Sequence, residues 1–144
     1  MDILDYDTSA RSIEGAYMPF VDPSTGEPVR HRAKGDKEER ELHLVLLGPE
    51  APESIRVFKQ LQHRASKKGA NHSPSDAEIE SERVSDAKAV ARLVVGGLLF
   101  SADRWVDITR ENAGDFLYKV GPLRGQAVKF ILDEGNFTTV ALAA

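Results

Sequence analysis

Residues 93–137 read LVVGGLLFSADRWVDITRENAGDFLYKVGPLRGQAVKFILDEGNF, and they hold most of the apolar periodicity of the chain and its only tryptophan, Trp105. The apolar residues that lead into this stretch recur at helical spacing and cover a wide stripe. The sequence Ser75-Asp-Ala-Glu78 is a capping box that marks a helix start. We therefore predict a helix from residue 75 to about residue 100. Gly96-Gly97 should either kink this helix or let another backbone approach closely.

The remainder of the stretch predicts two shorter helices after a connector that carries Trp105. Thr109 is a candidate N-cap, and apolar residues follow at helical spacing up to Val120. Gly121 ends this helix and Pro122 begins the next, which Gly135-Asn136 terminates. The buried face of the last helix should comprise Leu123, Ala127, Val128, Ile131 and Leu132. Residues 137–144 are apolar and uncharged, and they either pack on the core or fray.

Upstream of this stretch, two short segments predict a β-hairpin. Residues 41–47 alternate as a strand with apolar side chains on both faces, so this strand should be covered on both sides or lie at an interface. Residues 17–21 are its partner, and Pro19 restricts them to an edge. The charged connector at residues 27–40 is interpreted as a solvated loop, the alternative being a contact with an acidic partner. A further helix should begin at Pro52 and stop at Gly69.

These elements predict one mainly α domain: four helices with a short N-terminal β-hairpin, α+β but dominated by helices, over residues 15–144. Residues 1–14 are acidic and lack a sustained period, so we interpret them as a flexible N-terminal arm. The length of 144 residues and the mass of 15.8 kDa agree with one domain.

Composition and motifs give no sign of catalysis. The chain has no cysteine, and its four histidines lack ligand spacing. The sequence contains neither a phosphate-binding loop nor a GxSxG nucleophile motif. We therefore predict no catalytic residue, metal site or cofactor. A formal net charge of −4 argues against nucleic acid as the main partner, because such binding relies on many contacts from Lys and Arg to phosphates. The longest apolar run is too short to cross a membrane, and we expect the protein to stay in the cytoplasm.

The surplus of apolar surface suggests a protein partner. Trp105 is either a core residue that fastens the long helix to the following pair or an anchor in an interface, where tryptophan is enriched. With Val95, Leu99 and Phe116, Trp105 makes up the set of candidate interaction residues.

Four motifs, taken in order, resemble tail assembly chaperones of long-tailed, siphovirus-type bacteriophages. They are MPFVDPSTGEPV at residues 18–29, LHLVLLGPEAPESIRVFKQLQHRASKKG at residues 42–69, Trp105 followed by ITREN at residues 108–112, and VKFILDEGNF at residues 128–137. The resemblance covers roughly residues 17–137. The chain departs from it at residues 48–51, where Gly-Pro-Glu-Ala replaces the usual acidic-Ser helix cap.

The resemblance implies a non-enzymatic morphogenesis factor in the cytoplasm of the infected host cell. Such a chaperone binds the tape measure protein, keeps it soluble, helps to recruit the tail tube protein, and can self-associate. Two alternatives stay open at this point. One is a structural tail or head–tail component of the virion, and the other is a small helical regulatory or nucleic-acid-associated domain.

Overall fold

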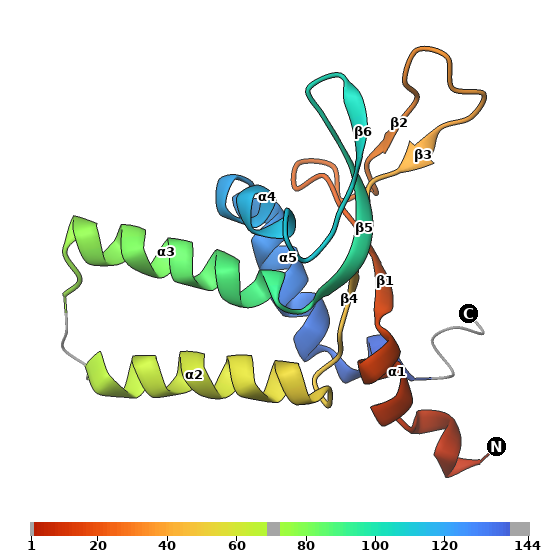
Figure 1. The fold of residues 1–144 in the computed structure, drawn as a ribbon. Helices are drawn as coiled ribbons and strands as arrows, with labels where there is room; N and C mark the ends of the chain where they lie inside the picture. The colour runs from red at the N-terminus through yellow and green to blue at the C-terminus, as the bar shows by residue number, and fades with distance from the viewer. Residues whose placement is uncertain (1, 69–72, 139–144) are drawn as a thin grey trace.

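The β-hairpin expected near the N-terminus is present, and it forms one half of a larger antiparallel sheet. The computed structural model describes residues 2–68 and 73–138 (Figure 1). Strand β1 (Ala16–Pro19) pairs with β4 (His43–Leu46), which pairs in turn with β5 (Val94–Ser101). Strand β6 (Arg104–Asp107) completes the order β1-β4-β5-β6 among the described residues.

The helix predicted over residues 75–100 is wrong in its second half. Helix α3 (Asp76–Ala91) ends at its C-cap Arg92, and the chain then enters β5. The protein is therefore an α+β domain, and the predicted mainly α, four-helix fold is wrong. Valine and phenylalanine favour strands, and a short apolar run can match the helical and the strand period equally well. Pairing with β4, distant in sequence, selects the strand.

Trp105 accordingly lies in a strand and not in a connector between helices. Ala102 and Asp103, with φ values of 52° and 60°, form the tight turn between β5 and β6. Positive φ at both central residues suits the twist of a two-residue hairpin. Gly96 and Gly97 lie inside β5, and the second of the two predicted roles is confirmed. A Cβ added to Gly97 would lie 2.6 Å from the His43 carbonyl oxygen, so glycine permits a close backbone approach.

Most helix starts follow the local signals in the sequence. Helix α2 spans Pro52–Lys68, and α3 begins after Ser75, whose Oγ accepts a hydrogen bond from the Glu78 N–H at 3.2 Å. Helix α5 (Gly121–Leu132) begins at the predicted Gly-Pro pair. Thr109 is not the N-cap of α4 (Ala113–Lys119). It exchanges hydrogen bonds with Asn112, which takes the N-cap position instead.

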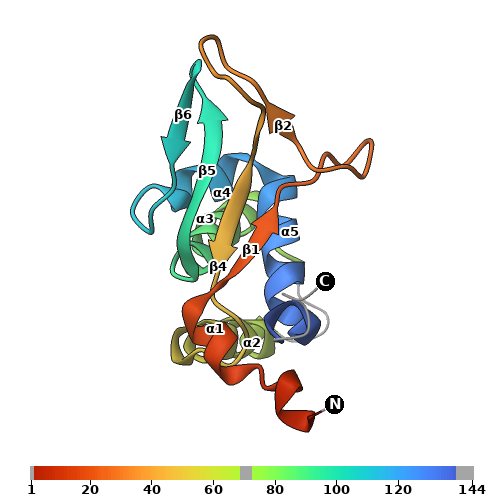
Figure 2. The same ribbon diagram turned by 90° about the vertical axis from the view of Figure 1, so that its right-hand side faces the viewer.

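Three α-helices form a layer on one face of the sheet. Helices α3, α4 and α5 lie to the left of the strands in Figure 1 and behind them in Figure 2. The opposite face of the sheet lies toward the viewer in Figure 2, with no described helix across its centre. The core lies between the two layers and includes Leu44, Val94, Leu99, Leu117 and Ile131. Helices α2 and α3 run side by side away from the sheet (Figure 1).

The predicted buried face of α5 is partly wrong. Leu123, Ala127 and Ile131 are at most 2% exposed, but Val128 is only half-buried and Leu132 is 58% exposed. Each helical residue advances about 100°, so residues 128 and 132 point to a different side of α5 from the buried stripe.

Two segments that were expected to lack regular secondary structure contain short helices or strands. The connector at residues 27–40 includes β2 (Arg30–His31), which pairs with β3 (Arg40–Glu41). Residues 2–14, expected to form an arm, contain a 3-10 turn (η1, Ile3–Tyr6) and helix α1 (Ser9–Glu14). Ser12 of α1 is fully buried, and its carbonyl accepts a hydrogen bond from the Gly48 N–H at 2.9 Å.

The C-terminal end of the described chain is a 3-10 turn, η2 (Glu134–Phe137), whose Phe137 is fully buried. The prediction that the apolar C-terminus packs on the core or frays falls mostly on residues 139–144, which lie outside the described residues. Within the described ranges, no helix combines the length and the apolarity that a bilayer crossing requires.

Candidate functional site

The face of the sheet opposite the helices carries a band of apolar and aromatic side chains. The register places Tyr17 opposite Val45, His43 opposite Leu98, and Phe100 opposite Trp105. Because side chains alternate along a strand, these residues point away from Leu44 and the helical layer. We call this surface the outer face, and it consists of Tyr17, His43, Val45, Val95, Leu98, Phe100 and Trp105.

Val95 reaches the outer face through a β-bulge. Val45 pairs with Gly96, but the next residue of β4, Leu46, pairs with Val94, so Val95 is the extra residue. Val94 is fully buried in the core, whereas Val95 is 47% exposed. A Cβ added to Gly15 would lie 3.1 Å from Val45 Cγ1 and 3.3 Å from Val95 Cγ2. The two valines therefore lie together beside Gly15, at one end of the outer face.

Tyr17 and His43 form the middle of the outer face. Their rings stack with centroids 4.3 Å apart, and Tyr17 remains 49% exposed. The Tyr17 hydroxyl donates a hydrogen bond to the Glu41 carboxylate at 2.8 Å. Burial, followed by this contact with Glu41, raises the pKa of Tyr17 to about 12. The stacking on His43 and the hydrogen bond to Glu41 hold the Tyr17 ring in place on the outer face.

Trp105 anchors the β2–β3 loop, residues 30–41, at the other end of the outer face. Its indole N–H donates a hydrogen bond to Asp36 Oδ2 at 2.8 Å, and the Arg40 guanidinium lies 4.9 Å from the ring centroid. Phe100 contacts Trp105 edge-on at 5.1 Å between centroids, and the His31 ring lies 4.1 Å from Phe100. Trp105 is half-buried and lies outside the main core.

Asp36 and Trp105 make the β2–β3 loop sensitive to acid. The hydrogen bond from Trp105, then that from the Ala33 N–H, lowers the pKa of Asp36 below its usual 3.8. A carboxyl with a depressed folded-state pKa stabilises the loop above pH 3.8, and that stabilisation is lost as pH falls through the folded-state pKa. We therefore expect the fluorescence of Trp105, the only tryptophan, to stay constant from neutral pH to about 4 and to change only below it.

The measurement is an emission titration accompanied by far-UV circular dichroism at each pH. Asp36→Asn should remove this fluorescence transition while leaving the helical signal unchanged. A wild-type transition centred above pH 3.8 would contradict the bonding described for Asp36.

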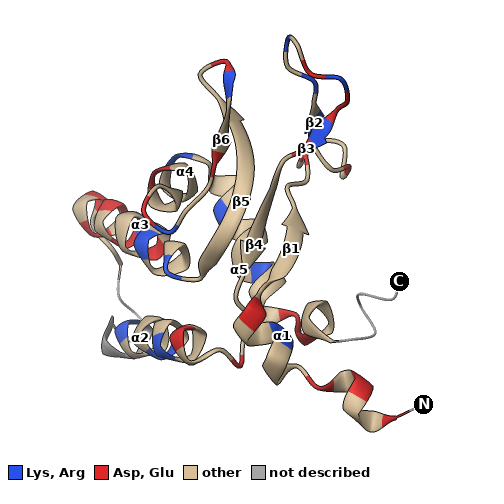
Figure 3. Cartoon of the chain, turned by 45° about the vertical axis from the view of Figure 1, so that its right-hand side comes forward, with Lys and Arg blue, Asp and Glu red and all other residues tan. Residues whose placement is uncertain are grey.

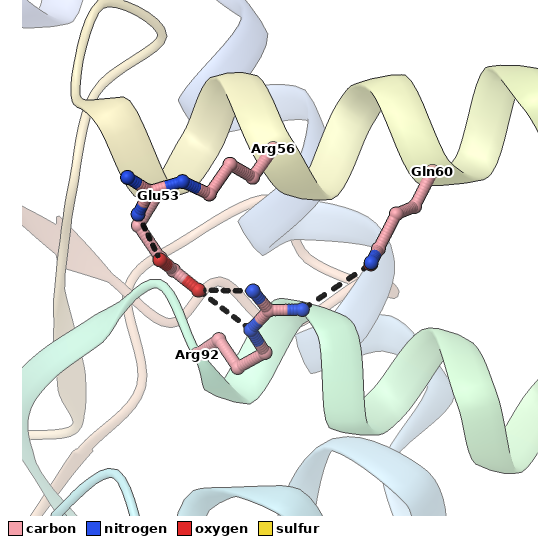
Figure 4. Close-up of polar contacts among 4 residues, drawn as sticks. All are labelled: Glu53, Arg56, Gln60 and Arg92. Atoms are coloured by element: carbon pink, nitrogen blue, oxygen red, sulfur yellow. Dashed lines mark hydrogen bonds and ion pairs between the residues drawn. The ribbon is translucent and has the colours of Figure 1, made fainter.

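A polar cluster outside the outer face holds two helices together (Figure 4). Arg92, at the end of α3, donates hydrogen bonds to Glu53 Oε1 at 2.6 Å and to Gln60 Oε1 at 3.2 Å, both on α2. Arg56 bonds the second Glu53 oxygen at 3.2 Å. The bond from Arg92, more than that from Arg56, lowers the pKa of Glu53. Each polar group here has a partner within the chain, so the cluster fixes α2 to α3.

The structure places two of the four predicted interaction residues on the outer face, namely Val95 and Trp105, at its opposite ends. Leu99 is 6% exposed and lies in the core, and Phe116 is half-buried in α4 within the helical layer. Sequence reasoning missed Tyr17, Val45 and Phe100. The apolar residues on both faces of the strand at residues 41–47 were the signal that could have located this surface.

Charge is absent from the strands that form the centre of this surface. Figure 3 shows β1, β4 and β5 without a Lys, Arg, Asp or Glu. The described residues contain no group of three or more His, Cys, Asp or Glu side chains that could hold a metal ion. The chemistry available at the outer face is therefore that of apolar and aromatic contact. No protein-family model, curated protein or solved structure matches this chain.

Proposed function

We propose that this protein is a non-enzymatic tail assembly chaperone of a long-tailed bacteriophage. In the host cytoplasm it binds the tape measure protein and assists assembly of the tail tube. The order of the four sequence motifs supports the family, and the outer face supports the mode of action. The single observation that carries the proposal is a sheet whose second face is apolar and stays partly open among the described residues, with Tyr17 and Val95 about half exposed.

A sheet with apolar side chains on both faces is normally packed between two layers. Here the helices supply one layer, while Tyr17 and Val95 remain about half exposed on the other side. An amphipathic helix laid across the outer face would supply the missing layer. Burying apolar surface stabilises such a complex by about 25 cal/mol per Å² before the costs of association are subtracted.

The tape measure protein matches this requirement in its chemistry. By the family resemblance it is a long helical protein that must be kept soluble before the tail is complete. Helices that expose apolar stripes aggregate unless another apolar surface covers them. The outer face offers Val45 and Val95 at one end and the Phe100–Trp105 pair at the other, and a helix could contact both ends at once.

The test is co-expression with a tape measure fragment that is insoluble alone. Wild-type chain should keep the fragment in the soluble fraction and co-purify with it. Val95→Asp should abolish both effects, because it places a charge in the apolar contact. Ile79→Asp is the matched control: Ile79 is a β-branched residue that is 50% exposed on α3, away from the outer face, and its replacement should leave solubilisation intact.

Three outcomes would overturn the proposal. The fragment could stay insoluble beside folded wild-type chain, or the chain could be found at stoichiometric amounts in purified virions, which would indicate a structural component. The third is tight, salt-sensitive binding to DNA, which would indicate a nucleic-acid-associated domain. Circular dichroism of both aspartate variants shows whether any loss of activity follows from unfolding.

A further inference from the structure

A second apolar surface lies in the helical layer, where α2, α3 and α5 border a cleft of about 760 Å³. Leu61 of α2, Val90 of α3, and Val128 and Leu132 of α5 supply its apolar lining. We call this cleft the helical groove. It shares no residue with the outer face, so its occupancy is a separate question from the proposed function.

Helix α5 presents two different sides, and only one of them is fully buried by the described residues. Leu123, Ala127 and Ile131 are buried toward the sheet. Gly121, Gly125, Val128 and Leu132 recur at intervals of four, three and four residues and line the helical groove. This spacing is that of a seam between packed helices. Leu132, at 58% exposure, is left in solvent by the described part of the chain.

The glycines make this side of α5 accessible to another backbone. A Cβ added to Gly125 would meet no atom within 4 Å, and one added to Gly121 would meet only the end of the Arg124 side chain, at 3.7 Å. Small residues at helix contacts allow the axes to approach closely, because no side chain separates them. Gly125 lowers the helix propensity of α5 by about 1 kcal/mol relative to alanine, without any neighbour in the chain that requires it.

The uncompensated charge along the helical groove is positive. Arg64 forms an ion pair with Asp86 across the groove. Asp133 accepts a hydrogen bond from the Gly135 N–H, as the N-cap of η2. Within the described ranges, Arg124 donates hydrogen bonds to the carbonyls of Leu117 and Tyr118, at 2.8 and 3.2 Å. Neither Arg124 nor Lys129 forms an ion pair among the described residues. The groove is lined by three cations, Arg64, Arg124 and Lys129, and two carboxylates, Asp86 and Asp133, so its net charge is +1.

We propose that the helical groove binds one amphipathic helix of a partner protein. The apolar stripe of that helix packs on the Gly125–Val128–Leu132 side of α5, and its flanking carboxylates pair with Arg124 and Lys129. Three helices already form the walls, so a fourth completes a bundle in the way that helix-in-groove recognition does. The positive charge of the wall selects an acidic helix over a basic one.

The probe is a fluorescein-labelled synthetic helix of about 18 residues, or five turns, with leucines at four- and three-residue intervals and flanking glutamates. A second peptide keeps the leucines and replaces every glutamate with lysine. Fluorescence anisotropy with the full chain should show about tenfold tighter binding of the acidic peptide, as expected for a few exposed ion pairs and repulsions. Lys129→Glu should remove or reverse that preference.

Variants at Gly125 test the position of the peptide. Gly125→Leu fills the seam and should abolish binding of the acidic peptide, whereas Gly125→Ala is the matched control that should retain it. Gly125 is an exposed position on α5, and a melting curve shows whether each variant is folded. Equal binding of the two peptides, or unchanged binding by Gly125→Leu, overturns the proposal. So does a dimer of the chain that excludes the peptide in sedimentation, because a second copy would then be the occupant.

The proposals for the outer face and for the helical groove can be tested independently of each other. Val95→Asp should leave peptide binding unchanged, and Gly125→Leu should leave solubilisation of the tape measure fragment unchanged. A chain that binds the acidic peptide but fails to solubilise the fragment would contradict only the proposed function.

Discussion

Gly97→Ala should destabilise the protein by about 3 kcal/mol, the sum of backbone strain and overpacking at one site. Gly97 has a φ of +155° and lies in β5 against β4. An added Cβ would lie 2.6 Å from the His43 carbonyl oxygen and 3.0 Å from Leu44 Cα. Both obstacles belong to the backbone, so no side chain can rotate away. The central pairing of the sheet must open to accept the methyl group.

The sign of this effect discriminates between the two structures that the sequence allows. In a helix extending to residue 100, Gly97→Ala would stabilise the chain by about 1 kcal/mol, because alanine is the better helix former. Urea unfolding followed by circular dichroism measures the difference. Gly96→Ala is the control at the next position, since its Cβ would meet only the Ile108 carbonyl oxygen at 4.0 Å, and it should cost less than about 1 kcal/mol. An increase in stability for Gly97→Ala would contradict the sheet order.

Short-range chemistry explains what could be predicted. The start of α3 follows from the Ser75 hydroxyl, and the starts of α2 and α5 follow from prolines that suit a first helical turn. The hairpin of β1 and β4 follows from an alternating strand and a shorter partner. Each of these signals is complete within a few residues, so no knowledge of distant contacts is needed to interpret it.

Residues 92–107 could not be assigned in that way. Their valines and leucines match the helical period, and the turn at Ala102-Asp103 lacks the glycine that typically marks a hairpin. What makes this segment a strand is its partner β4, far away in the chain. Apolar periodicity shows which residues are buried, but in a short run it does not show which element they pack against.

The same limit applies to the outer face. In a regular strand, Val95 and Leu99 would share one face, because their positions differ by four and side chains alternate with a period of two. The bulge at Val95 breaks the alternation, so Val95 points outward while Leu99 points into the core. Tyr17, Val45 and Phe100 join Val95 and Trp105 only through the pairing register of the four strands. A bulge and a register are properties of paired strands, and no single segment displays them.

Phe137→Ala should cost about 3–5 kcal/mol, the usual range for removing a fully buried aromatic ring. Phe137 is 0% exposed, and its ring packs edge-on against Phe130 with centroids 5.6 Å apart. Trp105 has the larger ring but is only half-buried, so Trp105→Ala should cost less, about 2 kcal/mol. Urea unfolding of the two variants measures this order, which is the reverse of the order expected from ring size.

Removal of the Phe137 ring should also loosen the N-terminal helix α1 from the sheet, because Phe137 lies where three segments meet. A Cβ added to Gly48 would lie 2.7 Å from Phe137 Cδ1 and 2.4 Å from Ser12 Oγ, so the ring, the end of β4 and α1 are packed together. Amide hydrogen exchange of residues 9–14 should therefore accelerate in Phe137→Ala by local opening, whereas exchange in β5 should accelerate only as far as the loss of global stability requires. Leu132→Ala, at a site 58% exposed, serves as the control and should change stability by less than about 0.5 kcal/mol. If Phe137→Ala were no more harmful than Leu132→Ala, the turn at residues 134–137 could not be what holds α1 against the sheet.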